Sequence, residues 1–248
     1  MNQKNVDIVF AIDTSESMRP CINGLSKNLE KIIVPFQSYG FNVRFGLLGY
    51  SVGKSSSGGF VAQVNTLSGG LESIYKPSNQ GDSLFTNNPK LFSDKIKSLE
   101  QVLQGDENHL FALDMAFDFP FGPVSTTRRV VCLFSDERIE DGFLGEWDPK
   151  IIVSMLCKKA MARRIMLYMA LPESSLLDDL SAIPSSHIES INGGDGLASI
   201  DFSKLLIQMG KSISVTSLQG NEGCFEIGVH GQKDWGFVSQ ATFREFKK

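Results

Sequence analysis

Three oxygen-bearing side chains follow the first apolar segment of the chain at alternate positions. Residues 6–12 are largely apolar, and Asp13, Ser15 and Ser17 come directly after them. One carboxylate and two hydroxyls in a single turn offer hard oxygen ligands, and Mg²⁺ and Mn²⁺ prefer such ligands in octahedral arrangements. The spacing Asp-x-Ser-x-Ser therefore predicts a divalent-metal site at the end of a strand.

The same residues also have a simpler interpretation. Asp and Ser commonly precede helices, because their side chains accept hydrogen bonds from the N–H groups of the first helical turn. Apolar residues at spacings of three and four begin soon afterwards, at Ile22 and Leu25. From these residues alone, helix capping and metal binding both remain open.

The positions of the apolar segments predict an α/β fold. Nearly continuous apolar runs are typical of parallel strands that are covered on both faces, and helical periodicity lies between these runs. Strands that alternate with helices indicate a doubly wound, mostly parallel central sheet with helices on both faces, as in Rossmann-like folds. The expected strands are 6–12, 43–50, 129–135 and 164–171, and the expected helical stripes are 22–36, 110–117, 151–156 and 202–213.

The remaining segments are weaker signals. We expect a long loop over 51–83 with an antiparallel edge strand near 59–67, a short helix after Pro172 and a strand near 187–191. A Gly-Gly-Asp-Gly turn follows at 193–196. Residues 224–229 and 235–237 flank a polar turn and predict a β-hairpin. The expected division is one domain over 1–218 and a C-terminal hairpin extension over 219–248, packed on or beside that domain.

A second acidic residue ends another predicted strand. In doubly wound sheets, ligands bind at the carboxyl ends of the strands near a topological switch point. Asp136 directly follows the apolar strand 129–135, so it is expected at the same edge as Asp13. The alternative is an ordinary strand-ending aspartate.

Together these segments resemble the metal-ion-dependent adhesion site of von Willebrand factor A (vWA) domains, a family that includes the integrin I domains. The resemblance covers about residues 5–215 and suggests an intracellular bacterial type of vWA domain. It implies that Asp13, Ser15, Ser17 and Asp136 surround one Mg²⁺ or Mn²⁺. In the family the serines usually contact the ion directly, the aspartates often act through water, and one position stays open for a carboxylate of a partner.

The third loop departs from the majority pattern of that family. Most vWA domains have Gly-Gly-Thr where this chain has Gly105-Asp106-Glu107, and a minority supply an acidic ligand instead. The register of the following Ala112-Leu113 favours Glu107 as that ligand, with Asp106 as the alternative. Either carboxylate would also be stabilised at a helix N-terminus without any metal. Glu16, His109 and the loop 143–147 are expected to flank the site.

Composition narrows the classes of partner. The chain has 248 residues, a formal net charge of −4 and no dense block of Lys or Arg, so nucleic acid is not an expected partner. No apolar stretch approaches the ~20 residues needed to span a bilayer, and no signal peptide is evident, so we expect no membrane partner. Four scattered cysteines without C-x-x-C spacing indicate neither a zinc site nor a disulfide framework. These features predict a reduced, cytoplasmic setting.

The expected function is a divalent-metal-dependent protein-interaction module that binds an Asp or Glu of a protein partner. Two alternatives remain. The first is a metal-independent scaffold that uses another surface, for example the C-terminal hairpin. The second is a Mg²⁺-dependent phosphohydrolase with Asp13 as nucleophile, but such enzymes usually need a second carboxylate two residues later, where this chain has Ser15. We therefore expect no enzymatic activity.

Overall fold

The computed structural model describes residues 4–38, 40–54, 60–75, 84–99, 108–139, 148–184 and 186–191, residue 208, and two short strands at 226–228 and 235–237. The elements in chain order are β1 (Lys4–Asp13), a 3₁₀ turn η1 (Glu16–Met18), α1 (Arg19–Ser38), β2 (Phe41–Lys54), β3 (Phe60–Thr66), α2 (Glu72–Tyr75), β4 (Phe85–Thr86), α3 (Pro89–Lys97), α4 (His109–Phe117), β5 (Thr127–Phe134), α5 (Pro149–Arg163), β6 (Ile165–Pro172), α6 (Ser175–Leu180), β7 (His187–Ile191), β8 (Glu226–Gly228) and β9 (Trp235–Phe237).

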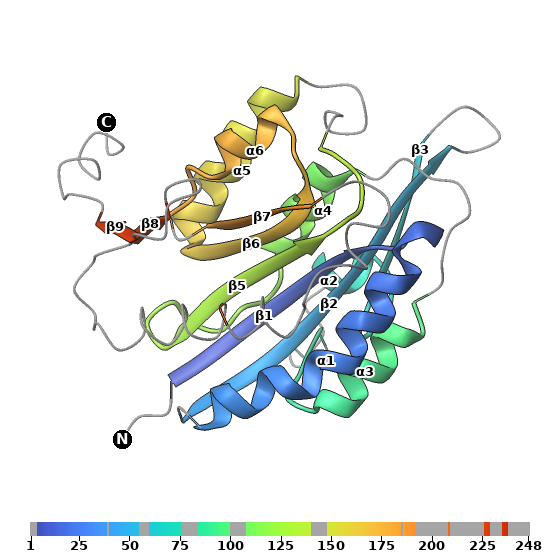
Figure 1. Cartoon of the computed structure of the whole chain (residues 1–248), viewed down its shortest axis with the longest axis vertical. Helices are drawn as coiled ribbons and strands as arrows, with labels where there is room; N and C mark the ends of the chain where they lie inside the picture. The colour runs from blue at the N-terminus through green and yellow to red at the C-terminus, as the bar shows by residue number, and fades with distance from the viewer. Residues whose placement is uncertain are drawn as a thin grey trace.

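One mostly parallel sheet organises the chain (Figure 1). Its strand order is β3-β2-β1-β5-β6-β7, and β4 also pairs with β2. The pairs β1–β2, β1–β5, β5–β6 and β6–β7 are parallel, whereas β3 and β4 run antiparallel to β2. The chain leaves β1 for β2 on one side and later returns to β5 on the other, so the switch point lies at β1. This confirms the predicted doubly wound α/β fold.

Helices cover both faces of the sheet. Alternate residues of β1 point to opposite faces, so Ile8, Phe10 and Ile12 pack in the core beneath α1 and α3, whereas Val9 and Ala11 pack beneath α4, α5 and α6. Figure 1 shows α1 beside α3 on one side of the sheet and α5 beside α6 on the other. Burial on both faces explains why the strands read as continuous apolar runs, and each fully buried large side chain contributes about 1.5–3 kcal/mol.

Most sequence expectations for individual elements are confirmed, with corrections at β2, α2 and α3; α2 (Glu72–Tyr75) lies in the segment 51–83, where no helix was expected. The four predicted strands correspond to β1, β2, β5 and β6, the antiparallel edge strand is β3, and the predicted short helix and weak strand are α6 and β7. However, β2 continues to Lys54, into the segment that was expected to be a loop. Helix α3 was not predicted, although Asn88 caps it by accepting a hydrogen bond from the N–H of Leu91 and Pro89 opens it.

The C-terminal expectations are covered only in part. Strands β8 and β9 pair antiparallel, as the predicted hairpin requires. The turn at 193–196 and, except for residue 208, the helical stripe at 202–213 lie outside the described residues. The division at residue 218 stays a prediction. Among the described helices, none is both long and apolar enough to cross a membrane.

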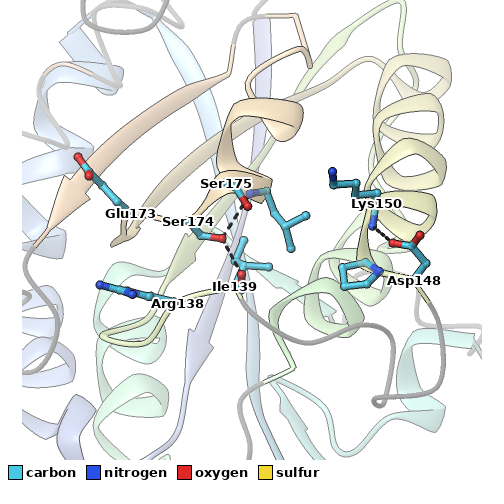
Figure 2. A pocket seen from close by; sticks show the side chains of 9 residues that line it. Arg138, Ile139, Asp148, Lys150, Glu173, Ser174 and Ser175 are labelled. Carbon is cyan, nitrogen blue, oxygen red and sulfur yellow. Dashed lines mark hydrogen bonds between the residues drawn. The ribbon is translucent and has the colours of Figure 1, made fainter.

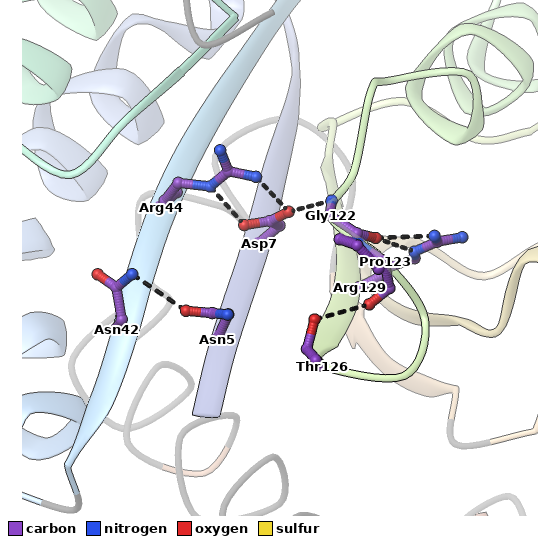
Figure 3. A network of polar contacts seen from close by, with 8 residues as sticks. All are labelled: Asn5, Asp7, Asn42, Arg44, Gly122, Pro123, Thr126 and Arg129. Carbon is purple, nitrogen blue, oxygen red and sulfur yellow. Dashed lines mark hydrogen bonds and ion pairs between the residues drawn. The ribbon is translucent and has the colours of Figure 1, made fainter. Parts of the chain in front are cut away.

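A buried ion pair ties the amino-terminal half of β1 to its neighbours (Figure 3). Asp7 is fully buried and accepts two hydrogen bonds of 2.8 Å from the guanidinium of Arg44 on β2. The N–H of Gly122 donates a third, at 2.7 Å, and the carbonyl of Gly122 in turn accepts two hydrogen bonds from Arg129. A buried carboxylate with this many donors is satisfied structurally, so Asp7 needs no functional role.

Candidate metal centre

The predicted ligands of β1 and β5 meet because these strands are neighbours in the sheet. The strands run parallel with Ile12 opposite Phe134, so both end at the same edge. Asp13 is the last residue of β1, and Ser135 and Asp136 follow the last residue of β5. The sheet therefore brings together side chains that are far apart in the sequence.

Asp13 forms the enclosed part of the site. Its side chain is 0 % exposed. The Oδ1 atom accepts a hydrogen bond of 2.7 Å from the N–H of Ser15, and Oδ2 accepts one of 2.9 Å from the hydroxyl of Ser135. Both carboxylate oxygens thus face fixed donors, which sets the orientation of the carboxylate.

Ser15 and Ser17 form the accessible part of the site, and they contact Asp136, which is 5 % exposed. The two serine hydroxyl oxygens lie 3.0 Å apart, and the hydroxyl of Ser17 donates a hydrogen bond of 3.1 Å to Oδ1 of Asp136. Ser15 is half-buried and Ser17 is exposed, so their hydroxyls can be reached from solvent. Three oxygens from two different loops are therefore linked by successive hydrogen bonds next to Asp13.

Helix capping does not account for the two serine hydroxyls. Ser15 occupies the N-cap position of η1, but its side chain makes no capping hydrogen bond. The hydroxyl of Ser17 is directed to Asp136 instead of to a backbone group of its own helix. The turn itself is held by the backbone bond from the N–H of Met18 to the carbonyl of Ser15 and by the buried side chain of Met18.

The pKa values of both carboxylates are raised by burial. Burial, as the main cause, raises the pKa of Asp13 from its ordinary 3.8 to about 7, the nearby charge of Asp136 raises it further, and hydrogen bonds from Ser15 and Ser135 oppose the rise. Burial is also the main reason why the pKa of Asp136 is raised. A cation bound here would stabilise the ionised forms of both groups.

The oxygen spacings fit an octahedral Mg²⁺. Adjacent ligands of an octahedral ion are separated by √2 times the metal–ligand distance, which gives about 2.9 Å for Mg²⁺ and about 3.2–3.7 Å for Ca²⁺. The observed spacings of 3.0 and 3.1 Å along Ser15, Ser17 and Asp136 are those of ordinary hydrogen bonds, and they are closer to the value for Mg²⁺ than to that for Ca²⁺. These hydrogen bonds hold the oxygens about as far apart as Mg²⁺ would need.

The residues next to the candidate centre differ in their exposure to solvent. Thr14 is buried and donates to the carbonyl of Tyr50, while Glu16 is exposed beside the serines. His109 was expected as an exposed rim contact, and this was wrong: it is 2 % exposed. Its Nε2 lies 3.1 Å from the carbonyl oxygen of Glu137, which attaches the start of α4 to the loop after β5.

The third-loop candidates, Asp106 and Glu107, and the loop 143–147 lie outside the described residues. The cap of α4 is supplied by Asn108, whose side chain is buried and accepts a hydrogen bond of 2.9 Å from the N–H of Phe111. Neither Asp106 nor Glu107 is therefore needed as the N-cap. Within the described ranges, no three His, Cys, Asp or Glu side chains are grouped in a way that could hold a metal. The candidate centre relies on two carboxylates and two hydroxyls.

A pocket lies at the same edge of the sheet, between the loops that follow β5 and β6 (Figure 2). It has a volume of about 500 Å³ and begins two residues after Asp136, at Arg138. Ser174 closes one side by donating a hydrogen bond of 2.6 Å to the carbonyl of Ile139. The charged side chains in its lining are two basic and two acidic ones, namely Arg138, Lys150, Asp148 and Glu173.

Comparison with solved structures identifies the type of fold. No family model and no curated protein matches the chain. Among solved structures, the SpRpn10 VWA domain is similar with a TM-score of 0.52 and 15% identity, over 83% of this chain and 95% of that one. The pilus adhesin SpaC from Lactobacillus rhamnosus GG is similar with a TM-score of 0.52 and 15% identity. That match covers 86% of this chain but 31% of the adhesin, so the chain spans about a third of the adhesin's length. These likenesses establish a vWA-like fold.

Proposed function

We propose that this chain is a divalent-metal-dependent protein-interaction module whose metal is completed by a carboxylate of the partner. The observation that carries the proposal is the row of oxygens from Ser15 through Ser17 to Asp136, at spacings of 3.0 and 3.1 Å. This spacing suits Mg²⁺, and Mn²⁺ accepts the same kind of oxygen ligands. The likeness to an adhesin, a protein named for attachment, is compatible with a binding role.

Within this proposal the residues have distinct roles. Ser15, Ser17 and Asp136 would hold the ion, since their oxygens are adjacent and the serines can be reached from solvent. Asp13, enclosed behind them, would contribute negative charge and fix the turn through the N–H of Ser15. The bound Mg²⁺ or Mn²⁺ would supply the positive charge that a partner carboxylate coordinates.

The third loop would add a further acidic ligand. Glu107 and the alternative Asp106 lie one and two residues before Asn108, which is buried and is followed by His109, which contacts the loop that carries Asp136. The described end of this loop is thus fixed beside the proposed centre. An acidic ligand there would offset more of the ion's charge and favour metal occupancy in the absence of a partner.

Two observations weigh against the phosphohydrolase alternative. An aspartyl nucleophile must present a carboxylate oxygen to its substrate, whereas both oxygens of Asp13 accept hydrogen bonds and the side chain is fully buried. The position two residues later, where such enzymes place an acid, holds the hydroxyl of Ser15. The positions of Asp13 and Ser15 therefore favour a binding role over hydrolysis.

Selectivity for a partner would come from side chains around the ion. Glu16 is exposed beside the serines and would favour a basic residue close to the coordinating carboxylate. The pocket beside the loop after β6, which contains Arg138 and Lys150, would accept polar groups of the partner that lie next to its coordinating carboxylate. We expect such contacts to discriminate among partners while the metal provides the common anchor.

A capture experiment tests the proposal. Native lysate is passed over the immobilised protein with Mg²⁺, with EDTA, and over the Asp13→Ala variant with Mg²⁺. The proposal predicts a partner that is retained only in the first condition and is lost when one of its acidic residues is changed to the amide, because an amide lacks the charge of a carboxylate. A partner retained equally in all three conditions would support the metal-independent scaffold instead.

A further inference from the structure

The hydroxyl of Ser135 contacts both loops of the candidate centre, as that of Ser17 does, but Ser135 is buried. It directly follows β5 and is 0 % exposed. Its hydroxyl donates a hydrogen bond of 2.9 Å to Oδ2 of Asp13 and accepts one of 3.1 Å from the N–H of Glu137. Its own N–H donates to the carbonyl of Ala170 on β6, which holds the residue against the neighbouring strand.

The direction of these bonds is fixed by chemistry. A backbone N–H can only donate, so the Ser135 oxygen must accept from Glu137. The single hydroxyl hydrogen is then left for Asp13, whose carboxylate accepts it when ionised.

The two bonds constrain the ligands on both sides. Because the bond to Glu137 bridges Asp136, it closes a tight turn around that ligand. The bond to Asp13 fixes one carboxylate oxygen, while Ser15 fixes the other. Rotation of the Asp13 carboxylate and movement of the Asp136 turn are thus both limited by one hydroxyl.

We propose that Ser135 is a positioning residue, which orients the Asp13 carboxylate and the Asp136 turn so that the oxygens of the site are ready for a divalent cation. This inference rests on the proposed function. Groups that orient the ligands of a metal commonly affect its affinity by about 10–100-fold. Ser135 does not contact the ion in this role; it acts through Asp13 and Glu137.

The test compares three variants by calorimetric titration with Mn²⁺. Ser135→Ala removes the hydroxyl, Ser135→Thr retains it, and Ser93→Ala is the matched control. Ser93 is also buried, and its hydroxyl makes one hydrogen bond of 3.1 Å, to the carbonyl of Ser26 far from the site. We expect Ser135→Ala to weaken Mn²⁺ binding about tenfold or more, and Ser135→Thr and Ser93→Ala to bind as the wild type does.

Thermal unfolding of all variants in EDTA is the control for effects on folding. Ser135→Ala and Ser93→Ala each lose one buried hydroxyl, so similar shifts in melting temperature with different Mn²⁺ affinities support positioning. Unchanged Mn²⁺ affinity in Ser135→Ala, or a loss in Ser135→Thr as large as in Ser135→Ala, would overturn the inference.

A second readout needs no metal. In a crystal structure of metal-free Ser135→Ala, the Asp13 carboxylate should rotate away from its wild-type orientation, and an unchanged carboxylate would overturn the role of Ser135. A wild-type protein that takes up no Mn²⁺ would instead overturn the proposed function. Normal uptake by both wild type and Ser135→Ala would overturn only the role of Ser135.

Discussion

The hydroxyl of Ser17 donates a hydrogen bond of 3.1 Å to Oδ1 of Asp136, although 119 residues separate the two in the chain. This contact joins the loop after β1 to the loop after β5, the two strands at the switch point of the sheet. An exposed hydroxyl gains little stability from such a bond, because water can replace it. We propose that both groups share a ligand, a divalent cation.

Ser17→Ala should therefore weaken metal binding more than it affects folding. Removing one of the predicted direct ligands should lower Mn²⁺ affinity by about tenfold or more, while the free energy of unfolding in EDTA should change by about 0.5 kcal/mol or less. Calorimetric titration and urea unfolding measure the two effects. Ser154→Ala, at an exposed position of α5, is the control. Equal Mn²⁺ affinities for the two variants would exclude Ser17 as a ligand.

Asp13→Asn should make the metal-free protein more stable at pH 8. The pKa of Asp13 is near 3.8 in an unfolded chain and about 7 in the folded protein. Between these values the folded protein retains a proton that the unfolded chain has lost, so stability falls as the pH rises from about 4 to about 7 and remains low above that. The neutral amide avoids this cost, which is on the order of 4 kcal/mol.

Urea unfolding in EDTA across this pH range tests the sign of the effect. The wild type should lose stability as the pH rises, whereas Asp13→Asn should be much less sensitive to pH. Asp94→Asn, at an exposed position of α3, is the control and should follow the wild type. A variant that is less stable than the wild type at pH 8 would contradict the prediction. We also expect Asp13→Asn to lose Mg²⁺ binding.

His109→Ala should affect both stability and the site. It removes a buried ring and the contact with the carbonyl of Glu137, so the free energy of unfolding should fall by about 1–3 kcal/mol. Since α4 is attached to the Asp136 loop through this contact, Mn²⁺ affinity should also fall. His187→Ala, on the edge strand β7, should leave the Mn²⁺ affinity unchanged. Unfolding and titration of both variants make the comparison, and normal Mn²⁺ affinity in His109→Ala would refute the coupling.

Arg44→Leu should have the opposite pattern: a large loss of stability and no effect on metal binding. It leaves the fully buried Asp7 carboxylate without its guanidinium partner, a change that typically costs about 3–5 kcal/mol. Asp7 and Asp13 are six residues apart on β1, or about 20 Å, so the site should be unaffected in the fraction that folds. Urea unfolding should show the loss, and Mn²⁺ titration should give the wild-type affinity. Altered affinity in folded Arg44→Leu would reveal coupling between the two ends of the sheet.

The sequence predicts best those elements whose apolar pattern has one cause, burial on both faces of a strand. Strands β1, β5 and β6 are buried on both faces, so their apolar runs are unambiguous. Helix α3 was missed although Asn88 and Pro89 mark its start, because the segment follows a Ser- and Gly-rich region without a strong preceding strand. Strand β4 has two residues, which is too short for any periodic signal.

In the candidate site, too, some features follow from the positions of the strands and others depend on packing. Asp13, Ser15, Ser17 and Asp136 could be predicted because strand ends and parallel neighbours determine where they lie, and the structure brings all four together. The contacts of Ser135 and the burial of His109 could not be predicted. They depend on which way a side chain turns after a strand ends, and the packing of distant segments decides this.

Calorimetric titration of the metal-free wild-type protein with Mg²⁺, repeated with Mn²⁺ and with the Asp13→Ala variant, tests the central claim most directly. We predict saturable binding of one ion by the wild type, no binding by Asp13→Ala, and circular dichroism spectra that show both proteins folded. A folded wild-type protein that gives no binding heat and no thermal shift with either ion at millimolar concentration would contradict the claim that these oxygens form a metal site.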